Sequence, residues 1–195
     1  MEDISDQYTP EDVEASAESY WDEHDAYEAT KEAHAEDPAF FFVDGPPYTS
    51  GQMHLGTAWN KTLKDAVVRY KRMTGHRVTD RPGYDMHGLP IEVKVEEELG
   101  FDSKKDIEEF GVEKFIEECK TFAERNREKM DDDFQSIGAW MDWDNPYKTM
   151  SPEYMEATWW AFQNVHENGL VKQGKRAINQ CPRCETAIAD NEVEY

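Results

Sequence analysis

One stretch limits the possible folds more than any other: residues 39–79, where an apolar run, a loop, a helical pattern and a second apolar run follow one another. Ala39–Val43 is too short and too apolar for a surface helix, so it predicts a buried strand. Apolar residues then recur at helical spacing over 59–70, and Gly75 is placed to end that helix. Val78 lies in a brief second strand. This order predicts parallel strand pairing, and therefore an α/β fold.

The loop between the first strand and the helix has the sequence GPPYTSGQMHLGT, Gly45–Thr57. Glycines let a backbone approach a ligand closely, and a helix N-terminus offers N–H groups and partial positive charge to an anion. Ligands of open α/β sheets bind beyond the carboxyl ends of the strands, where this loop is expected. Its pattern is neither a P-loop nor GxGxxG. Two interpretations stay open: a nucleotide site, or a glycine–proline connection capped by His54.

A second candidate is Asp85, within GYDMHGLP at residues 83–90. It comes just after the second expected strand, so we expect it at the same sheet edge as His54. A carboxylate at that edge can pair with a substrate ammonium group. The alternative interpretation is an ordinary turn aspartate.

The three cysteines divide into a single residue and a pair. Cys119 lies on the apolar stripe of a long helix expected over 112–137, which predicts a buried structural thiol. Cys181 and Cys184 form a CxxC, and two thiolates at that spacing supply half of a tetrahedral zinc site. A redox pair and a chance pair are the alternatives. A further helix is expected over 152–165.

Charge distinguishes the beginning of the chain from the rest. The net charge over 195 residues is -22, and residues 1–37 hold 14 acidic side chains and one basic one. Such a surface repels phosphate at long range, but acidity is also a proteome-wide trait of salt-loving organisms, in which salt screens the repulsion. Charge therefore does not exclude an RNA partner. The apolar face of this leader (Val13, Ala17, Tyr20 and Trp21) predicts docking on a core; the alternative is a solvated arm.

Neither a signal peptide nor an apolar run of membrane-spanning length is visible in the sequence. The sequence therefore predicts a cytoplasmic protein without a membrane partner, and disulfides are not expected in that compartment.

At these motifs the sequence resembles the class I aminoacyl-tRNA synthetases, and within them the isoleucine-specific branch of archaeal type, with haloarchaeal acidity. The loop over 45–57 is similar to the HIGH signature of the family. The stretches GYDMHGLPIEVKVEEELG, YMEATWWAF and CPRCETAIADNEVEY are similar to later motifs of the isoleucyl form. The resemblance covers about residues 38–195.

The resemblance implies ATP-dependent activation of isoleucine, with Mg²⁺, and transfer to tRNA(Ile). It also implies a Rossmann-like parallel sheet, of which this chain holds the N-terminal half. The expected division is an acidic helical extension over 1–37, the N-terminal half of the catalytic domain over 38–179, and the start of a zinc-binding and editing insertion over 180–195. The family's KMSKS loop and second zinc half-site are not among these residues. We therefore expect an N-terminal portion that is inactive in isolation. The alternatives are a valyl-tRNA synthetase portion and a non-catalytic ATP- or RNA-binding fragment.

The resemblance also assigns roles to individual residues. The amino-acid-binding residues are Gly45, Pro46 and Asp85. The ATP-binding residues are His54, Gly56 and Thr57, with His54 and Thr57 also catalytic. The zinc ligands are Cys181 and Cys184. Thr57 departs from the family, which has histidine there; threonine donates one hydrogen bond but carries no charge.

Overall fold

The computed structural model describes residues 8–189 and residue 193. The helices are α1 Pro10–Glu23, α2 Ala26–Ala33, α3 Leu55–Met73, α4 Leu89–Leu99, α5 Lys104–Phe110, α6 Val112–Ser136 and α7 Pro152–Glu167. The strands are β1 Ala39–Phe41, β2 Arg77–Thr79, β3 Gly83–Tyr84, β4 Tyr147–Lys148, β5 Asn179–Cys181 and β6 Thr186–Ile188. Two compact units result. The first holds residues 8–45, 53–82 and 130–146, and the second holds 46–52, 83–129 and the residues from 147 on. None of the helices in the described ranges has the length and apolar character needed to cross a membrane.

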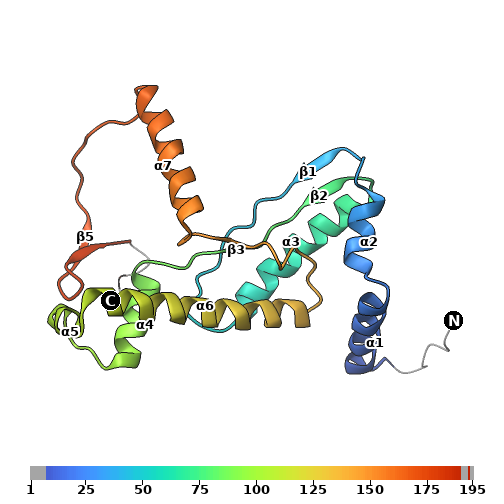
Figure 1. The fold of residues 1–195 in the computed structure, drawn as a ribbon, viewed down its shortest axis with the longest axis horizontal. Helices are drawn as coiled ribbons and strands as arrows, with labels where there is room; N and C mark the ends of the chain where they lie inside the picture. The colour runs from blue at the N-terminus through green and yellow to red at the C-terminus, as the bar shows by residue number, and fades with distance from the viewer. Residues whose placement is uncertain (1–7, 190–192, 194–195) are drawn as a thin grey trace. The chain divides into compact units, whose positions relative to one another are not determined.

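The first unit contains the strand–helix–strand arrangement expected from the sequence. β1 and β2 pair in parallel with Ala39 opposite Arg77, and α3 connects them (Figure 1). α3 ends at its cap Thr74, and Gly75 follows with a φ of 77°, a left-handed conformation that favours glycine. The α/β prediction is therefore confirmed for this part of the chain.

The expected burial of the first strand is wrong. β1 is shorter than the apolar run, and the Phe41 side chain is 74% exposed. A continuous apolar run predicts a strand covered on both faces. In the described residues, Ala39 and Phe41 on one face of β1 are exposed, so that face lacks the cover.

α3 also buries the opposite face to the one that its apolar pattern predicts. Trp59 and Leu63 are 65% and 58% exposed, whereas Lys61 is only 2% exposed. Val68 and Arg72 are buried beside Lys61 on the same helix. The two buried bases each have a buried carboxylate partner, Asp44 for Lys61 and Asp80 for Arg72. Ion pairing therefore compensates the burial of charge on this face.

The leader packs on the first unit through part of its expected face. The rings of Trp21 and Trp140 lie edge to face, with centroids 5.2 Å apart. The Tyr27 hydroxyl donates to Asp80 at 3.1 Å, and burial raises the pKa of that hydroxyl. Val13 and Tyr20 are exposed. The described part of the leader is therefore helical, and the side chains of Trp21 and Tyr27 make its main contacts with the rest of the first unit.

In the second unit β3 and β4 pair in parallel, with Gly83 opposite Tyr147. The expectation that Asp85 follows the second strand of the sheet is corrected here. Asp85 follows β3, and in the described residues β3 pairs with β4 rather than with β1 or β2. The sequence did not reveal β3, which begins directly after Pro82, because so short a strand shows no alternating pattern of its own.

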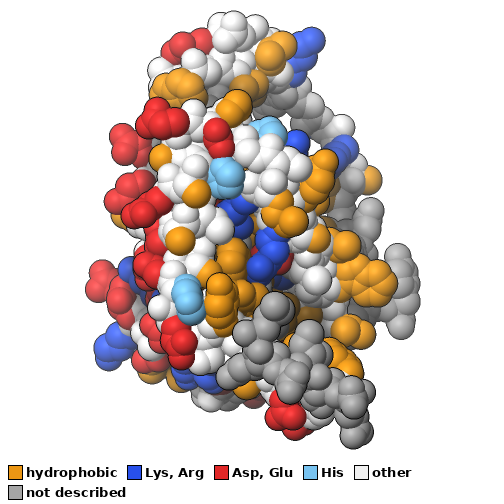
Figure 2. All heavy atoms as spheres, turned by 90° about the vertical axis from the view of Figure 1, so that its right-hand side faces the viewer, with side chains coloured by type: hydrophobic (Ala, Val, Ile, Leu, Met, Phe, Trp, Pro, Cys, Tyr) orange, Lys and Arg blue, Asp and Glu red, His pale blue; other side chains and the backbone are white. Residues whose placement is uncertain are grey.

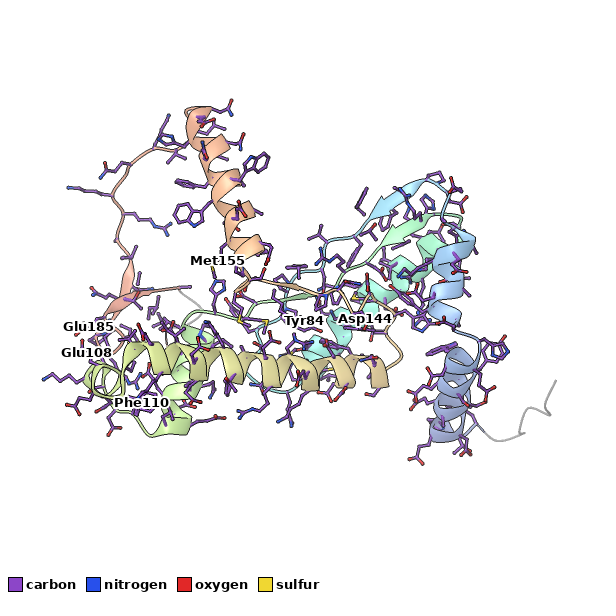
Figure 3. All side chains as sticks on the ribbon, viewed as in Figure 1. Tyr84, Glu108, Phe110, Asp144, Met155 and Glu185 are labelled. Carbon is purple, nitrogen blue, oxygen red and sulfur yellow. The ribbon has the colours of Figure 1, made fainter. Side chains whose placement is uncertain are left out.

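The core of the second unit lies under α4 and α6. Phe115, Phe122 and Ala123 of α6 are buried, together with Ile91 and Val95 of α4. The apolar stripe of α6 is confirmed only in part, because its residues Val112, Ile116 and Ile137 are exposed. Figure 3 labels Phe110 at the end of α5, whose ring packs against Phe101 at 5.5 Å. Cys119 is half-buried, and burial raises the pKa of its thiol to about 11, as befits an unreactive structural cysteine.

Acidic side chains are prominent on the face shown in Figure 2, where red carboxylates are interspersed with orange apolar groups. Several large apolar side chains of α7 are exposed as well, among them Trp159 and Trp160. The surface is thus both strongly acidic and locally apolar.

Candidate functional site

His54 lies at the N-terminus of α3 and caps it. Its Nδ1 accepts hydrogen bonds from the backbone N–H groups of Gly56 and Thr57, at 3.1 and 3.3 Å. An Nδ1 that accepts two hydrogen bonds is unprotonated, so the neutral ring carries its proton on Nε2. The interpretation of His54 as a helix cap is therefore confirmed, and the interpretation of the loop as a nucleotide site stays a prediction. The capped ring keeps one donor, its Nε2–H group.

Gly56 fits against this cap. A Cβ placed there would lie 3.0 Å from Cε1 and 3.2 Å from Nδ1 of His54, closer than most side-chain contacts. The glycine therefore lets the imidazole reach both backbone donors. Thr57 is half-buried one residue further along the first turn. His54, Gly56 and Thr57 are thus brought together, as expected for neighbours on one helix turn.

A buried ionic cluster supports the start of the glycine loop. Asp44, which is fully buried, accepts from Lys61 at 2.6 Å and from Lys64 at 2.5 Å. Lys64 also donates to the Gly45 carbonyl at 2.9 Å, which places Gly45 in the first unit. Burial lowers the pKa of the Lys61 ammonium, and the charge of Asp44 opposes that effect. The ammonium also lies 4.5 Å from the ring centroid of Phe134, a cation–π contact.

In the second unit, backbone hydrogen bonds join Asp85 to two residues of the glycine loop, Pro47 and Thr49. Its N–H donates to the Pro47 carbonyl at 2.8 Å, and its carbonyl accepts from Thr49 N–H at 3.1 Å. On its other side the carboxylate Oδ1 accepts from the Thr149 hydroxyl at 3.1 Å. The backbone and one carboxylate oxygen are therefore fixed, while the side chain keeps a quarter of its surface exposed.

Asp85 opens into a cavity of about 460 Å³. Its polar wall consists of Asp85, His87, Thr149 and Thr158, and its apolar wall of Pro46, Tyr154, Met155 and Trp159. Figure 3 labels Met155 near the start of α7, and Tyr84 on β3. A single carboxylate facing apolar groups suits a small ligand with an ammonium group and an aliphatic side chain. Pro46 and Asp85 are thus brought together as the sequence predicted.

The cysteine pair lies on the β5–β6 hairpin. Cys184 N–H points to Cys181 Sγ at 3.4 Å, and such backbone hydrogen bonds lower the pKa of the Cys181 thiol. Burial raises the pKa of Cys184. Arg183 between them pairs with Glu96 at 2.6 Å and ties the hairpin to α4. Within residues 8–189 and residue 193, no group of three or more His, Cys, Asp or Glu side chains could hold a metal ion. The donors present fit half of a zinc site.

Sequence reasoning missed Thr149. It lies in Lys148-Thr-Met-Ser151, which resembles the KMSKS signature but comes too early in the chain. Its contacts with Asp85 come from parallel pairing of β3 with β4, two strands separated by more than sixty residues. The one available sequence signal was a threonine directly after a short strand-like dipeptide, which is too common to be informative.

Comparisons with known proteins identify the family of this chain. The family model described as "tRNA synthetases class I (I, L, M and V)" matches residues 16–195. The chain therefore belongs to the class I tRNA synthetases. The resemblance found in the motifs is confirmed at the level of the isoleucine branch by similar proteins named isoleucine–tRNA ligase. That of Haloquadratum walsbyi is 77% identical over all 195 residues, and that of Halobacterium salinarum is 68% identical over 193 residues.

The isoleucine–tRNA ligase of Methanoregula boonei is 58% identical over the whole chain. Each of these three relatives is matched over 18% of its own length, so this chain spans about a fifth of them. A crystal structure of the Agrobacterium radiobacter K84 agnB2 LeuRS–tRNA–LeuAMS complex has a similar fold. Its TM-score is 0.66 at 23% identity, covering 96% of this chain and 21% of that one.

Proposed function

We propose that this chain is the N-terminal portion of an isoleucine–tRNA ligase. The longer protein would activate isoleucine with ATP and Mg²⁺ and transfer it to tRNA(Ile). The observation that carries the proposal is the cavity at Asp85, with one carboxylate opposite an apolar wall. In a chain so similar to proteins named isoleucine–tRNA ligase, that cavity has the chemistry of an aliphatic amino-acid pocket.

The proposed reaction has two steps. A carboxylate oxygen of isoleucine attacks the α-phosphorus of ATP, and the bond to the bridging oxygen breaks with its electron pair leaving on pyrophosphate. A terminal ribose hydroxyl of the tRNA then attacks the acyl carbon, loses its proton, and displaces AMP. No protein atom is bonded covalently to the substrate, so positioning and charge stabilisation supply the catalysis. Asp85 would bind the ammonium group, with Pro46 and Gly45 bounding the amino acid.

On the ATP side the proposal assigns His54, Gly56 and Thr57 to the phosphates and adenine. Because Nδ1 of His54 is occupied by the helix cap, its Nε2–H is the ring donor available to a phosphate oxygen. Gly56 offers backbone where a side chain would meet the imidazole. Thr57 would contribute a neutral hydroxyl donor, with the helix N-terminus supplying partial positive charge.

The finer structural assignments belong to the same proposal. They are a Rossmann-like sheet completed by the longer chain, an acidic leader suited to high salt, and a cytoplasmic location. Cys181 and Cys184 would supply two of four zinc ligands, with the others coming from elsewhere in the longer protein. What supports the last point is the hairpin itself, which holds both sulfurs together and favours the thiolate form of Cys181.

Thiol reactivity provides a prediction for the cysteines. In the full-length protein treated with a chelator at pH 8, iodoacetamide is expected to modify Cys181 first and Cys119 last. The reason is that the pKa of Cys181 is lowered, whereas burial raises that of Cys119 to about 11. Peptide mass spectrometry would give the rates, with at least a tenfold difference expected. Restored zinc should protect the pair and leave Cys119 unchanged; equal rates at Cys181 with and without zinc would argue against a metal there.

The function itself is tested by exchange of labelled pyrophosphate into ATP in the full-length protein. Isoleucine is expected to drive the exchange. Valine should do so less efficiently by roughly 10- to 200-fold, because one methylene is worth about 1–3 kcal/mol in an apolar pocket. A preference for valine would instead indicate a valyl enzyme. No exchange with either amino acid, despite measurable ATP binding, would indicate a non-catalytic binding protein.

A further inference from the structure

The Thr149 hydroxyl forms three hydrogen bonds to three consecutive residues that follow β3. Met86 N–H donates to Oγ1 at 3.0 Å, Asp85 Oδ1 lies 3.1 Å from it, and His87 Nδ1 lies 2.9 Å from it. The Thr149 side chain is buried, with 5% of its surface exposed. Its backbone is also fixed, because its N–H donates to the Tyr84 carbonyl at 3.1 Å.

The chemistry of these groups determines the direction of each hydrogen bond. A hydroxyl has one proton to donate and two lone pairs to accept. An ionised Asp85 can only accept, so the hydroxyl proton points to Oδ1. The two remaining partners must then donate, which assigns a proton to Nδ1 of His87. Oγ1 thus donates one hydrogen bond and accepts two, so protein groups occupy all of its hydrogen-bonding positions.

The consequence for Asp85 is a defined carboxylate orientation. Oδ1 faces Thr149, and among the residues that the structure describes Oδ2 has no hydrogen-bond partner. Oδ2 belongs to a group that lines the cavity, so it is the oxygen left for a ligand. Without Thr149, the carboxylate could rotate about its Cβ–Cγ bond, whose torsional profile is broad.

We infer that Thr149 is the positioning residue of the amino-acid pocket: its hydroxyl holds Asp85 so that Oδ2 meets the ammonium group of the substrate. It also holds the His87 ring through the hydrogen bond from Nδ1 to Oγ1. This inference rests on the function proposed above. Thr149 itself need not touch the substrate, since its effect passes through Asp85.

The test is T149V in the full-length protein, which removes the hydroxyl and keeps the shape. In pyrophosphate exchange, KM for isoleucine should rise about tenfold or more, the size expected for a lost hydrogen bond to a charged group. KM for ATP should stay within about twofold. T149S retains the hydroxyl and should restore the isoleucine KM. T74V serves as the control, because Thr74 also donates from its hydroxyl, to Tyr70, but caps α3 in the other unit.

Each outcome decides the matter. If the wild-type protein exchanges with isoleucine but T149V keeps its KM, the inference is overturned and the proposed function stands. If T149V loses active protein without changing either KM, or if T149S fails to restore KM, Thr149 has only a structural role and the inference is overturned. If T149V is insoluble, T149A replaces it, because alanine removes the hydroxyl without adding any donor; an unchanged isoleucine KM would then overturn the inference. A wild-type protein without exchange overturns the proposed function instead.

Discussion

Replacing Asp85 with asparagine is expected to lower kcat/KM for isoleucine in pyrophosphate exchange by two to three orders of magnitude. Asp85 is the carboxylate of the cavity, and its partner would be a substrate ammonium group beside the apolar wall. Removing one partner of a hydrogen-bonded charge pair in a binding site costs about 2–5 kcal/mol. The amide keeps the size of the side chain and can still accept from Thr149, so the loss isolates the charge.

The control for this prediction is D144N. Asp144 is an exposed aspartate in the first unit, labelled in Figure 3, and the same change there should leave kcat/KM within about twofold. The loss at Asp85 should appear chiefly as a higher KM for isoleucine, with ATP affinity retained. Equal losses for isoleucine and ATP would show that the substitution disturbs the fold rather than the amino-acid pocket.

Replacing Asp44 with asparagine is expected to destabilise α3 by about 3–5 kcal/mol, because Lys61 would remain buried without its directly paired carboxylate, and Asp131 acts on it only through its charge. Lys61 is 2% exposed and Asp44 is fully buried, so water cannot take the place of the carboxylate. Hydrogen exchange of amides in the peptide covering 55–73, measured in the full-length protein, should accelerate by two to three orders of magnitude. This readout does not depend on enzymatic activity.

A second substitution tests the cause. In D44N/K61M, the thioether would lie beside the rings of Phe134 and Trp143, where the Lys61 ammonium now lies at 4.5 and 5.7 Å. The double variant has no buried ammonium left to pair, and the amide oxygen of the introduced asparagine can still accept from Lys64, so protection of α3 should largely return. If the double variant exchanges as fast as D44N, the loss came from the backbone of the loop rather than from an unpaired charge.

The local elements were predictable because their signals are short-range. His54 and Gly75 mark the two ends of α3 through capping chemistry that neighbouring residues determine. The apolar spacing of α6 predicted the burial of Phe115 and Phe122 in the same way, although Ile116 on the same stripe is exposed. The candidate site residues were identified by motifs, and the structure brings Pro46 to Asp85 and both cysteines onto one hairpin.

The buried face of α3 could not be predicted, because burial depends on what covers a helix. Its apolar residues Trp59 and Leu63 are exposed, while Lys61 is buried by pairing with Asp44. The two partners are 17 residues apart, and periodicity carries no information about an ion pair across that distance.

The sequence by itself determined the family and the parallel strand–helix–strand unit around the glycine loop, and it supplied candidate residues for ATP, amino acid and metal that stay predictions. The tertiary structure alone decided how Asp85 is oriented. Its carboxylate is held by Thr149, which reaches it only because β3 and β4 lie side by side. Capping and amphipathicity act over a few neighbouring residues, whereas the direction of a hydrogen bond between strands depends on a pairing that forms only when the chain folds.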